Sequence, residues 1–321
     1  MIWKIIFDYD FNFEKEENMK KLKFISLSIL SAFLIFLNTT TNVFAEEIYY
    51  TNLNGATLTE EQYNNLLRVF SEDTIATMTS EAIDLLKDET ELSLSSEEKF
   101  IRIDEWHDSE GNLINSTETE VSEMIATNFQ QPMYPQSWNV THTTSMKRLY
   151  MQVVSTSASL KVVTITNTWL SLPSTRSYDV IAVRPETNSM TINVNSDTIS
   201  GYQNWDGNVI NYNISTSNTK KSSSFTGNGG IGISMNIVDS VSSSLENSMT
   251  VIFVCGNENF KVYGTYQHAT SDVTLAQSQS YSFSSSGLGE VLYYSNSTIR
   301  NKYDNMQGVY LNYTSYEELY G

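Results

Sequence analysis

From Gln136 onward, hydrophobic and polar residues alternate in short runs that recur about every ten residues. Such alternation places apolar side chains on one face of a strand and polar side chains on the other, as in an antiparallel sheet with one wet face. The number of these strands exceeds what a single sheet commonly holds. We therefore predict an antiparallel β-sandwich or jelly-roll-like domain over residues 132–321. The clear runs are 160–169, 178–183, 190–194, 209–214, 231–237, 249–254, 260–266, 281–283 and 291–294.

The pattern before Gln131 is different and predicts a small acidic α/β region over residues 46–131. Thr59 and Gln62 have the spacing of a capping box, in which both side chains satisfy free N–H groups of a first helical turn. Ser71 and Thr79 begin two further short helices. Two β-runs, 100–103 and 113–121, then flank the turn 108–112 and predict a hairpin. The apolar face behind the capping box consists of Tyr63, Leu66, Leu67 and Phe70.

A basic head, an apolar run and small residues near Ala45 give residues 19–45 the form of a signal peptide. The apolar run has about 14 residues, whereas a span needs about 20, so we expect cleavage before Glu46 and no stable membrane span in the mature chain. Residues 1–18 do not fit a signal head, and we expect a start codon called too far upstream. The predicted location is therefore extracellular.

Charge is distributed unevenly along the mature chain. Residues 46–131 contain 20 acidic and 4 basic residues, while residues 132–321 contain 12 and 10. The change marks a candidate boundary near Gln131, and the acidity disfavours nucleic acid as a partner. The single cysteine, Cys255, cannot form an internal disulfide, and we expect it to be a buried core residue.

Few residues suggest catalysis. The three histidines, His107, His142 and His268, are scattered and keep no metal-binding spacing. Carboxylate pairs such as Asp104-Glu105 leave an extracellular carboxylate-dependent hydrolase as one alternative. The tripeptide 266–268 is a weak candidate site, for which a polar strand end is the simpler explanation. We expect a protein that is not an enzyme and uses no cofactor.

Asp108, Glu110 and Asn112 alternate around Gly111 and form a weak candidate calcium site. A full calcium loop ends in a bidentate glutamate at its twelfth position, and Thr119 stands there instead. A plain hairpin turn explains the segment better, and we expect no metal.

Aromatic residues among short polar ones favour binding of a cell-surface carbohydrate or protein. Tyr202, Trp205 and Asp206 lie in an expected loop, and Trp138 lies in a similar setting. Their rings could stack on sugars while neighbouring amides and hydroxyls form hydrogen bonds. These four residues are the predicted ligand-binding site, and the sequence leaves the oligomeric state open.

A second binding hypothesis concerns membranes. Residues 215–254 could form an alternating hairpin of the kind that pore-forming toxins insert into a bilayer. However, the run 251–254 is continuously apolar, which does not suit a strand that lines a water-filled lumen.

Four segments resemble a group of uncharacterised exported proteins from low-GC Gram-positive bacteria. They are 50–63 (YTNLNGATLTEEQY), 176–181 (RSYDVI), 232–236 (GISMN) and 263–269 (YGTYQHA). The resemblance spans most of the mature chain and implies export, a short helical N-terminal segment and a β-rich remainder. It implies no activity, ligand or site residue.

Overall fold

The computed structural model describes residues 47–110, 112–129, 140–156, 160–186, 193–194, 196–213, 216–222, 229–254, 260–284, 291–304 and 308–313. The chain divides into the units Met1–Glu47 and Ile48–Gly321, and the fold below is that of the second. The expected upstream extension and signal peptide lie outside the described residues, as do Trp138 and Cys255.

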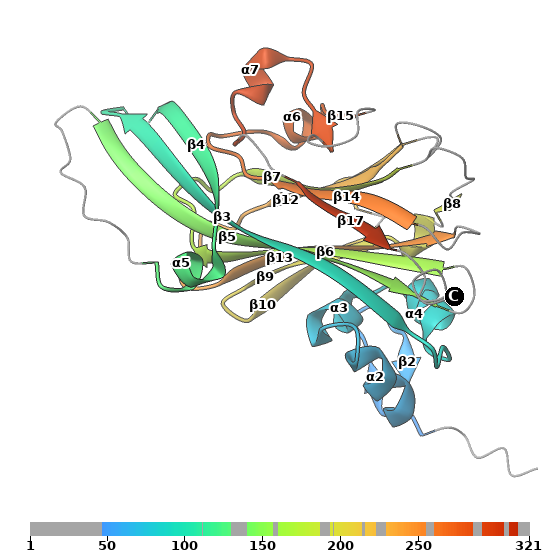
Figure 1. Cartoon of the computed structure of the whole chain (residues 1–321). Helices are drawn as coiled ribbons and strands as arrows, with labels where there is room; N and C mark the ends of the chain where they lie inside the picture. The colour runs from blue at the N-terminus through green and yellow to red at the C-terminus, as the bar shows by residue number, and fades with distance from the viewer. Residues whose placement is uncertain are drawn as a thin grey trace, which may run out of the picture. The chain divides into compact units, whose positions relative to one another are not determined.

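Besides two small two-stranded sheets, the described residues form two main antiparallel sheets, of which the larger has eight strands (Figure 1). They are β3 (Ser93–Asp108), β4 (Leu113–Val121), β5 (Val140–Ser155), β6 (Leu160–Ser171), β8 (Asn193–Val194), β9 (Ser200–Trp205), β10 (Asn208–Asn213) and β13 (Leu245–Val254). Their order is β10-β9-β13-β6-β5-β3-β4, and β8 also pairs with β13. In Figure 1 the ends of β3, β4 and β5 nearest the β3–β4 turn project beyond the other strands; we call this part the arm.

The smaller sheet has five strands in the order β11-β12-β7-β14-β17. They are β7 (Tyr178–Pro185), β11 (Thr219–Lys221), β12 (Ile231–Asn236), β14 (Phe260–Gln267) and β17 (Val309–Tyr313). The two antiparallel sheets enclose one hydrophobic core, which confirms the predicted mainly-β sandwich. Within residues 215–254, β12 and β13 do not pair as the two arms of a hairpin in this structure, because β12 pairs with β7 whereas β13 pairs with β6 and β9 of the other sheet; insertion of this region into a membrane stays a prediction.

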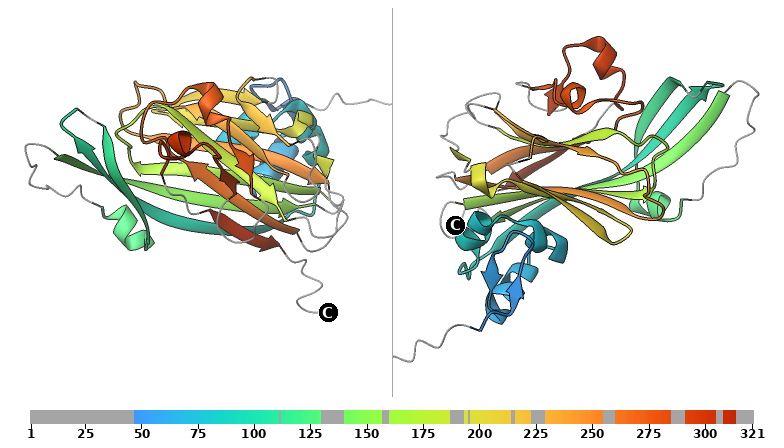
Figure 2. Two further views of the ribbon diagram at one scale, coloured as in Figure 1. Left: turned by 90° about the horizontal axis from the view of Figure 1, so that it is seen from above. Right: turned by 180° about the vertical axis from the view of Figure 1, so that it is seen from behind.

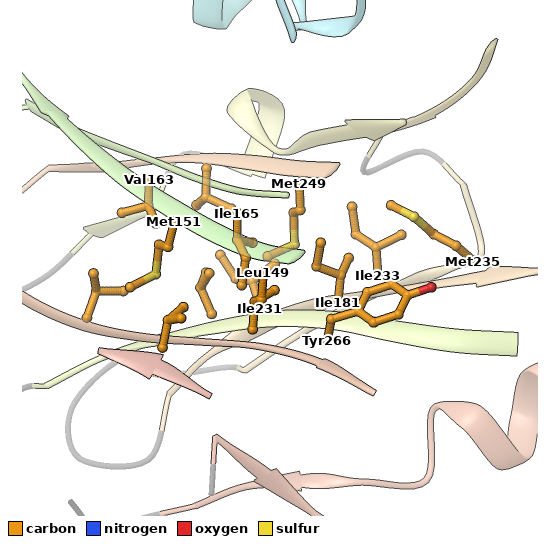
Figure 3. Packing of buried hydrophobic residues seen from close by; sticks show 14 of the residues in the cluster. Leu149, Met151, Val163, Ile165, Ile181, Ile231, Ile233, Met235, Met249 and Tyr266 are labelled. Atoms are coloured by element: carbon orange, nitrogen blue, oxygen red, sulfur yellow. The ribbon is translucent and has the colours of Figure 1, made fainter. Parts of the chain in front are cut away.

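Aliphatic and methionine side chains fill the space between the sheets (Figure 3). Ile165 and Met249 of the larger sheet and Ile181 and Ile233 of the smaller sheet are fully buried. Each such side chain contributes about 1.5–3 kcal/mol through the hydrophobic effect. The sheets approach so closely at Gly264 that an added Cβ would lie 2.6 Å from Ile165 Cδ1.

The N-terminal residues form a layer on the outer face of the larger sheet. It contains β1 (Tyr50–Thr51), β2 (Thr57–Leu58), α2 (Glu60–Leu67), α3 (Glu72–Thr77) and α4 (Ser80–Leu86). The predicted capping box is confirmed: Gln62 N–H donates to Thr59 Oγ1 (3.3 Å), and Thr59 N–H donates to Gln62 Oε1 (2.9 Å). Leu66 and Leu86 belong to a second core cluster with Val162 of β6.

A C-terminal layer covers the outer face of the smaller sheet (Figure 2). It contains α6 (Leu275–Ser278), β15 (Ser282–Phe283), β16 (Leu292–Tyr293) and α7 (Ser297–Arg300). Tyr281 and Tyr294 pack there in one cluster with Val180 and Ala182 of β7. The remaining helices are α5 (Glu123–Thr127), which follows β4, and the short 3-10 helix η1 (Ser196–Thr198). No helix in the described ranges is long and apolar enough to cross a bilayer.

The composition change near residue 131 does not divide the unit Ile48–Gly321. β3, from the acidic segment, pairs with β5 along its whole length, from Ser93 opposite Ser155 to Asp108 opposite Val140. Backbone hydrogen bonds therefore join the segments 46–131 and 132–321 in one sheet, and the second unit contains both. The acidic residues of the first segment lie both at the helix starts of the N-terminal layer and along β3 and β4, so the charge difference does not mark a separate fold unit.

Candidate functional site

The predicted sugar-stacking residues of β9 lie in a different environment from the one expected. Tyr202 is only 2% exposed, and its hydroxyl donates to Glu246 Oε1 at 2.6 Å. Burial, followed by the negative charge of Glu246, raises the pKa of Tyr202. Trp205 is half-buried against the main core. Tyr202 therefore offers no open face, whereas Trp205 remains partly exposed, and both lie on an internal strand of the larger sheet rather than in the expected loop.

Asp206 has a local structural role. It adopts a φ of 50°, in the left-handed region, in the turn between β9 and β10. Its carboxylate accepts hydrogen bonds from the backbone N–H groups of Ser242, Ser243 and Ser244 at 2.8–3.0 Å. The hydroxyl of Ser243 and the backbone N–H groups lower the pKa of Asp206. This turn holds the residues before β13 in place, and Trp138 lies outside the described residues.

The segment of the weak calcium candidate closes the β3–β4 hairpin. Asp108 Oδ1 accepts from the backbone N–H groups of Glu110 (2.9 Å) and Asn112 (2.8 Å). This side chain therefore mimics a backbone turn, as aspartate commonly does in hairpins. Within the described part of the chain, no three His, Cys, Asp or Glu side chains are grouped to hold a metal ion.

Asp104 and Glu105 do not converge on one substrate. They are consecutive residues of β3, so their side chains point to opposite faces of the sheet. Asp104 contacts Arg102, His142 and Thr144, whereas Glu105 accepts from Ser174 Oγ at 3.0 Å. This pair therefore lacks the facing geometry that a glycosidase requires.

One face of the arm combines an aromatic pair with polar side chains. Trp106 of β3 lies directly opposite His142 of β5, and their rings stack with centroids 4.6 Å apart and planes 10° apart. Next to Trp106 on its other side is Asn115 of β4, which is exposed. Trp106 is half-buried and so remains in part accessible, whereas the His142 side chain is only 12% exposed.

Asp104 holds this face in position. It lies two residues from Trp106 on β3 and accepts from Thr144 Oγ1 at 2.6 Å. Its other oxygen lies 2.7 Å from Arg102 Nε, and His142 Nε2 lies 3.1 Å from Oδ1. Burial alone would raise the pKa of Asp104, but hydrogen bonds from Arg102 and Thr144 lower it overall. The ionised carboxylate thus fixes the ring that stacks on Trp106.

We call this surface the Trp106 face. Exposed hydroxyl and amide groups of β4 extend it toward the edge of the sheet, where β4 pairs with β3 alone among the described strands. Donors, acceptors and an aromatic ring on one rigid strand surface are suited to a polar ligand with an apolar side. Its members are Arg102, Asp104, Trp106, Asn115, Thr117, Thr119, His142 and Thr144.

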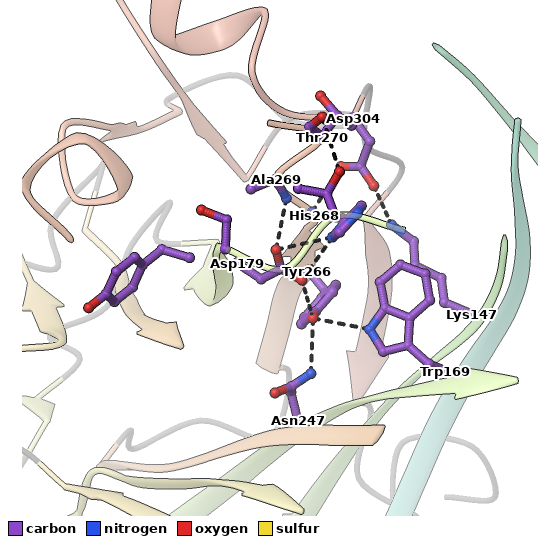
Figure 4. Close-up of polar contacts among 12 residues, drawn as sticks. Lys147, Trp169, Asp179, Asn247, Tyr266, His268, Ala269, Thr270 and Asp304 are labelled. Atoms are coloured by element: carbon purple, nitrogen blue, oxygen red, sulfur yellow. Dashed lines mark hydrogen bonds and ion pairs between the residues drawn. The ribbon is translucent and has the colours of Figure 1, made fainter. Parts of the chain in front are cut away.

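A second group of polar residues is enclosed between the sheets (Figure 4). Asp179 of β7 is fully buried and accepts from Tyr266 Oη at 2.5 Å and from Ala269 N–H at 2.8 Å. Its two oxygens also lie 3.0 and 3.1 Å from His268 Nδ1. Tyr266 Oη in turn accepts from Asn247 Nδ2 at 2.9 Å, which links the smaller sheet to the larger one.

Lys147 of β5 lies in the same region. Its Nζ lies 2.8 Å from Asp304 Oδ2 and 2.9 Å from Glu118 Oε1. The backbone N–H of His268 donates to the other oxygen of Asp304 at 3.1 Å. Burial alone would lower the pKa of Lys147, but the charges of Asp304 and Glu118 raise it overall.

His268 and Asp179 have the geometry of a catalytic dyad, but a substrate has no access to them. Burial would lower its pKa, but the carboxylate of Asp179 outweighs burial and raises it. A carboxylate-bound imidazole can serve as a general base, yet His268 and Asp179 are both 0% exposed. The simpler explanation from sequence, a polar strand end, accounts for its backbone contacts with Asp304 but not for the contacts of its ring with Asp179. This buried polar group is suited to holding the two sheets together rather than to catalysis on a substrate.

Sequence reasoning missed the Trp106 face because it took residues 100–103 as half of a hairpin and considered Asp104 only as part of a carboxylate pair with Glu105. The alternation through residues 100–108 does carry a signal, since Arg102, Asp104 and Trp106 share one face at a period of two. The second strand needed to complete the face, β5, lies beyond the segment 131–139. No local pattern indicates that pairing.

Comparisons with known proteins give no relative that identifies the chain. No protein family matches it, and no curated protein matches it. The Streptococcus agalactiae AgI/II polypeptide BspA C terminal domain aligns at 8% identity over 55% of this chain and 87% of that one, with a TM-score of 0.24. AvmM, described as catalysing macrocyclization in alchivemycin A biosynthesis, aligns at 8% identity over 49% and 82%, with a TM-score of 0.25. Scores of this size do not indicate a shared fold.

Proposed function

We propose that this protein acts outside the cell as a non-catalytic binding protein and that the Trp106 face contacts a surface glycan. The observation that carries the proposal is the Trp106–His142 stack, whose Trp106 is partly exposed beside the exposed polar residues of β4. The signal-like segment 19–45 supports an extracellular setting.

The chemistry of the face supports a sugar ligand. The ring of Trp106 can pack on the apolar side of a pyranose, while Asn115, Thr117 and Thr119 offer exposed hydrogen-bonding groups beside it. Asp104 fixes Arg102 and His142 before the ligand arrives, so less side-chain entropy is lost on binding. The buried cluster around His268 offers no comparable access.

Glycan-array binding of the full chain, followed by titration calorimetry with a bound glycan, tests the proposal. Replacing an aromatic anchor costs about 2 kcal/mol or more, so Trp106→Ala should weaken Kd about 30-fold. Tyr293→Ala removes an aromatic ring that is 44% exposed in the C-terminal layer and should leave Kd unchanged. Circular dichroism checks that both variants fold.

The two variants distinguish a specific binding site from nonspecific binding by exposed aromatic rings. Equal loss in Trp106→Ala and Tyr293→Ala would contradict a site on the Trp106 face. A wild-type protein that binds no glycan, or a Trp106→Ala variant that binds as tightly as wild type, would refute the proposal.

A further inference from the structure

The cluster of Lys147, Asp304 and Glu118 supports an inference that is separate from the proposed binding function and does not depend on it. The three side chains are 1%, 0% and 3% exposed, respectively. They come from β5, from the segment before β17 and from β4. Lys147 Nζ lies 2.8 Å from one carboxylate and 2.9 Å from the other. An amine is thus held between two carboxylates in a site from which water is excluded.

The surroundings of this amine are aromatic. Lys147 Nζ lies 6.0 Å from the ring centroid of Trp169 and 5.7 Å from that of Tyr266. Charged groups are costly in such a place, so a buried ion pair gains little over a neutral arrangement. One cation beside two carboxylates also leaves a net negative charge, which increases that cost.

The geometry points to an amide bond between Lys147 Nζ and Asp304 Cγ, formed within the folded protein with Glu118 as the catalytic base. Amine and carboxyl are already in contact, so their effective concentration far exceeds that of separate molecules. The fold excludes the water that would otherwise oppose condensation. The product is neutral, and the charges of the ion pair disappear.

Each proton transferred in the reaction has an acceptor within the cluster. The ammonium of Lys147 passes one proton across the 2.8 Å contact to Asp304 Oδ2, leaving a neutral amine and a carboxylic acid. The amine attacks Cγ, and negative charge develops on Oδ1, which already accepts the N–H of His268 at 3.1 Å. Glu118 removes a proton from the attacking nitrogen and delivers it to the departing hydroxyl of Oδ2. The C–N bond forms, the C–Oδ2 bond breaks and one water molecule leaves.

Mass spectrometry of the purified full chain tests the bond directly. The intact protein should be lighter than its sequence by one water, and a protease digest should contain a branched peptide linking Lys147 to Asp304. Glu118→Gln lacks the base and should retain the full mass. Lys147→Arg keeps the positive charge and should also retain it.

Matched controls distinguish a folding defect from a loss of amide-bond formation. Lys99→Arg alters a surface pair with Glu120 at 3.1 Å and should still lose one water. Circular dichroism and gel filtration establish that Glu118→Gln and Lys147→Arg are folded. A folded wild-type protein with its full mass and no branched peptide after prolonged incubation overturns the inference. A branched peptide that forms equally in Glu118→Gln overturns the role of Glu118.

Discussion

Asp179 should be among the least replaceable polar residues in the interior. It is 0% exposed and accepts hydrogen bonds from Tyr266, His268 and Ala269, all of which follow or lie within β14. Asp179→Ala removes the only negative charge that directly contacts the His268 ring among the described residues. The hydroxyl of Tyr266 and the N–H of Ala269 lose their acceptor at the same time.

The magnitude follows from these lost contacts. Breaking a buried ion pair by removing one partner costs about 3–5 kcal/mol. An unsatisfied buried N–H adds about 1–3 kcal/mol, although His268 can shed its proton and so limit the total. We expect Asp179→Ala to lower the free energy of unfolding by about 4 kcal/mol, a large share of a typical 5–15 kcal/mol. Asp179→Asn keeps one acceptor oxygen and should lose about half as much.

The pH dependence has a definite sign. The folded-state pKa of His268 is raised above its ordinary value of 6.5, despite burial, because of Asp179. The stabilisation from protonated His268 is therefore fully present below the unfolded-state pKa and is lost as pH rises through the folded-state pKa. Asp179→Asn and His268→Gln should both flatten this loss of stability at alkaline pH.

Urea unfolding followed by tryptophan fluorescence at about pH 6 and about pH 9 measures both quantities. Asp84→Asn is the matched control, because Asp84 forms a surface pair with Lys87 at 2.6 Å and its side chain is 66% exposed. That variant should change stability by less than about 0.5 kcal/mol. An Asp179→Ala variant that loses less than about 1 kcal/mol, or a pH profile unchanged in His268→Gln, would refute the reasoning.

Three further changes test other parts of the fold. Gly264→Ala places a methyl group 2.6 Å from Ile165 Cδ1 and 2.7 Å from Met151 Sδ, and this overpacking should cost about 1–3 kcal/mol in urea unfolding. Thr59→Ala removes the capping box of α2 and should cost about 1 kcal/mol, whereas Thr59→Ser should cost little. Asp206→Ala removes the acceptor that orders the turn before β13, so amide hydrogens of that turn should exchange faster while the core strands keep their protection.

Local structure was predictable because its causes are local. The capping box at Thr59 and the turns at Ser71 and Thr79 form where side chains and backbone N–H groups lie three residues apart. Most alternating runs became strands, but the expectation of one wet face is wrong for the central strands, since β6 and β7 are buried on both faces by the core and the outer layers. The predicted run 160–169, for example, lies within β6.

Pairing between distant strands was not predictable from these patterns. β12 and β13 alternate as the two arms of a hairpin would, yet they belong to opposite sheets, with β12 paired to β7 and β13 paired to β6. The same limit applies to the Trp106 face, which needs β5 beside β3. It applies most strongly to Lys147 and Asp304, which are 157 residues apart in the sequence.

An amide at Lys147 would give this fold an internal covalent cross-link, which its single cysteine cannot provide. A single cysteine allows no internal disulfide, so a chain exported as we propose would rely on its core alone. A covalent link across 157 residues restricts the unfolded chain as a disulfide would, and the chain-entropy relation gives about 5 kcal/mol for a loop of that length. The link would also join β5 of the larger sheet to the segment that leads into β17 of the smaller one. Asp304 further bonds the backbone of His268, whose ring contacts Asp179, so the covalent link and the buried polar group hold the same end of the sandwich.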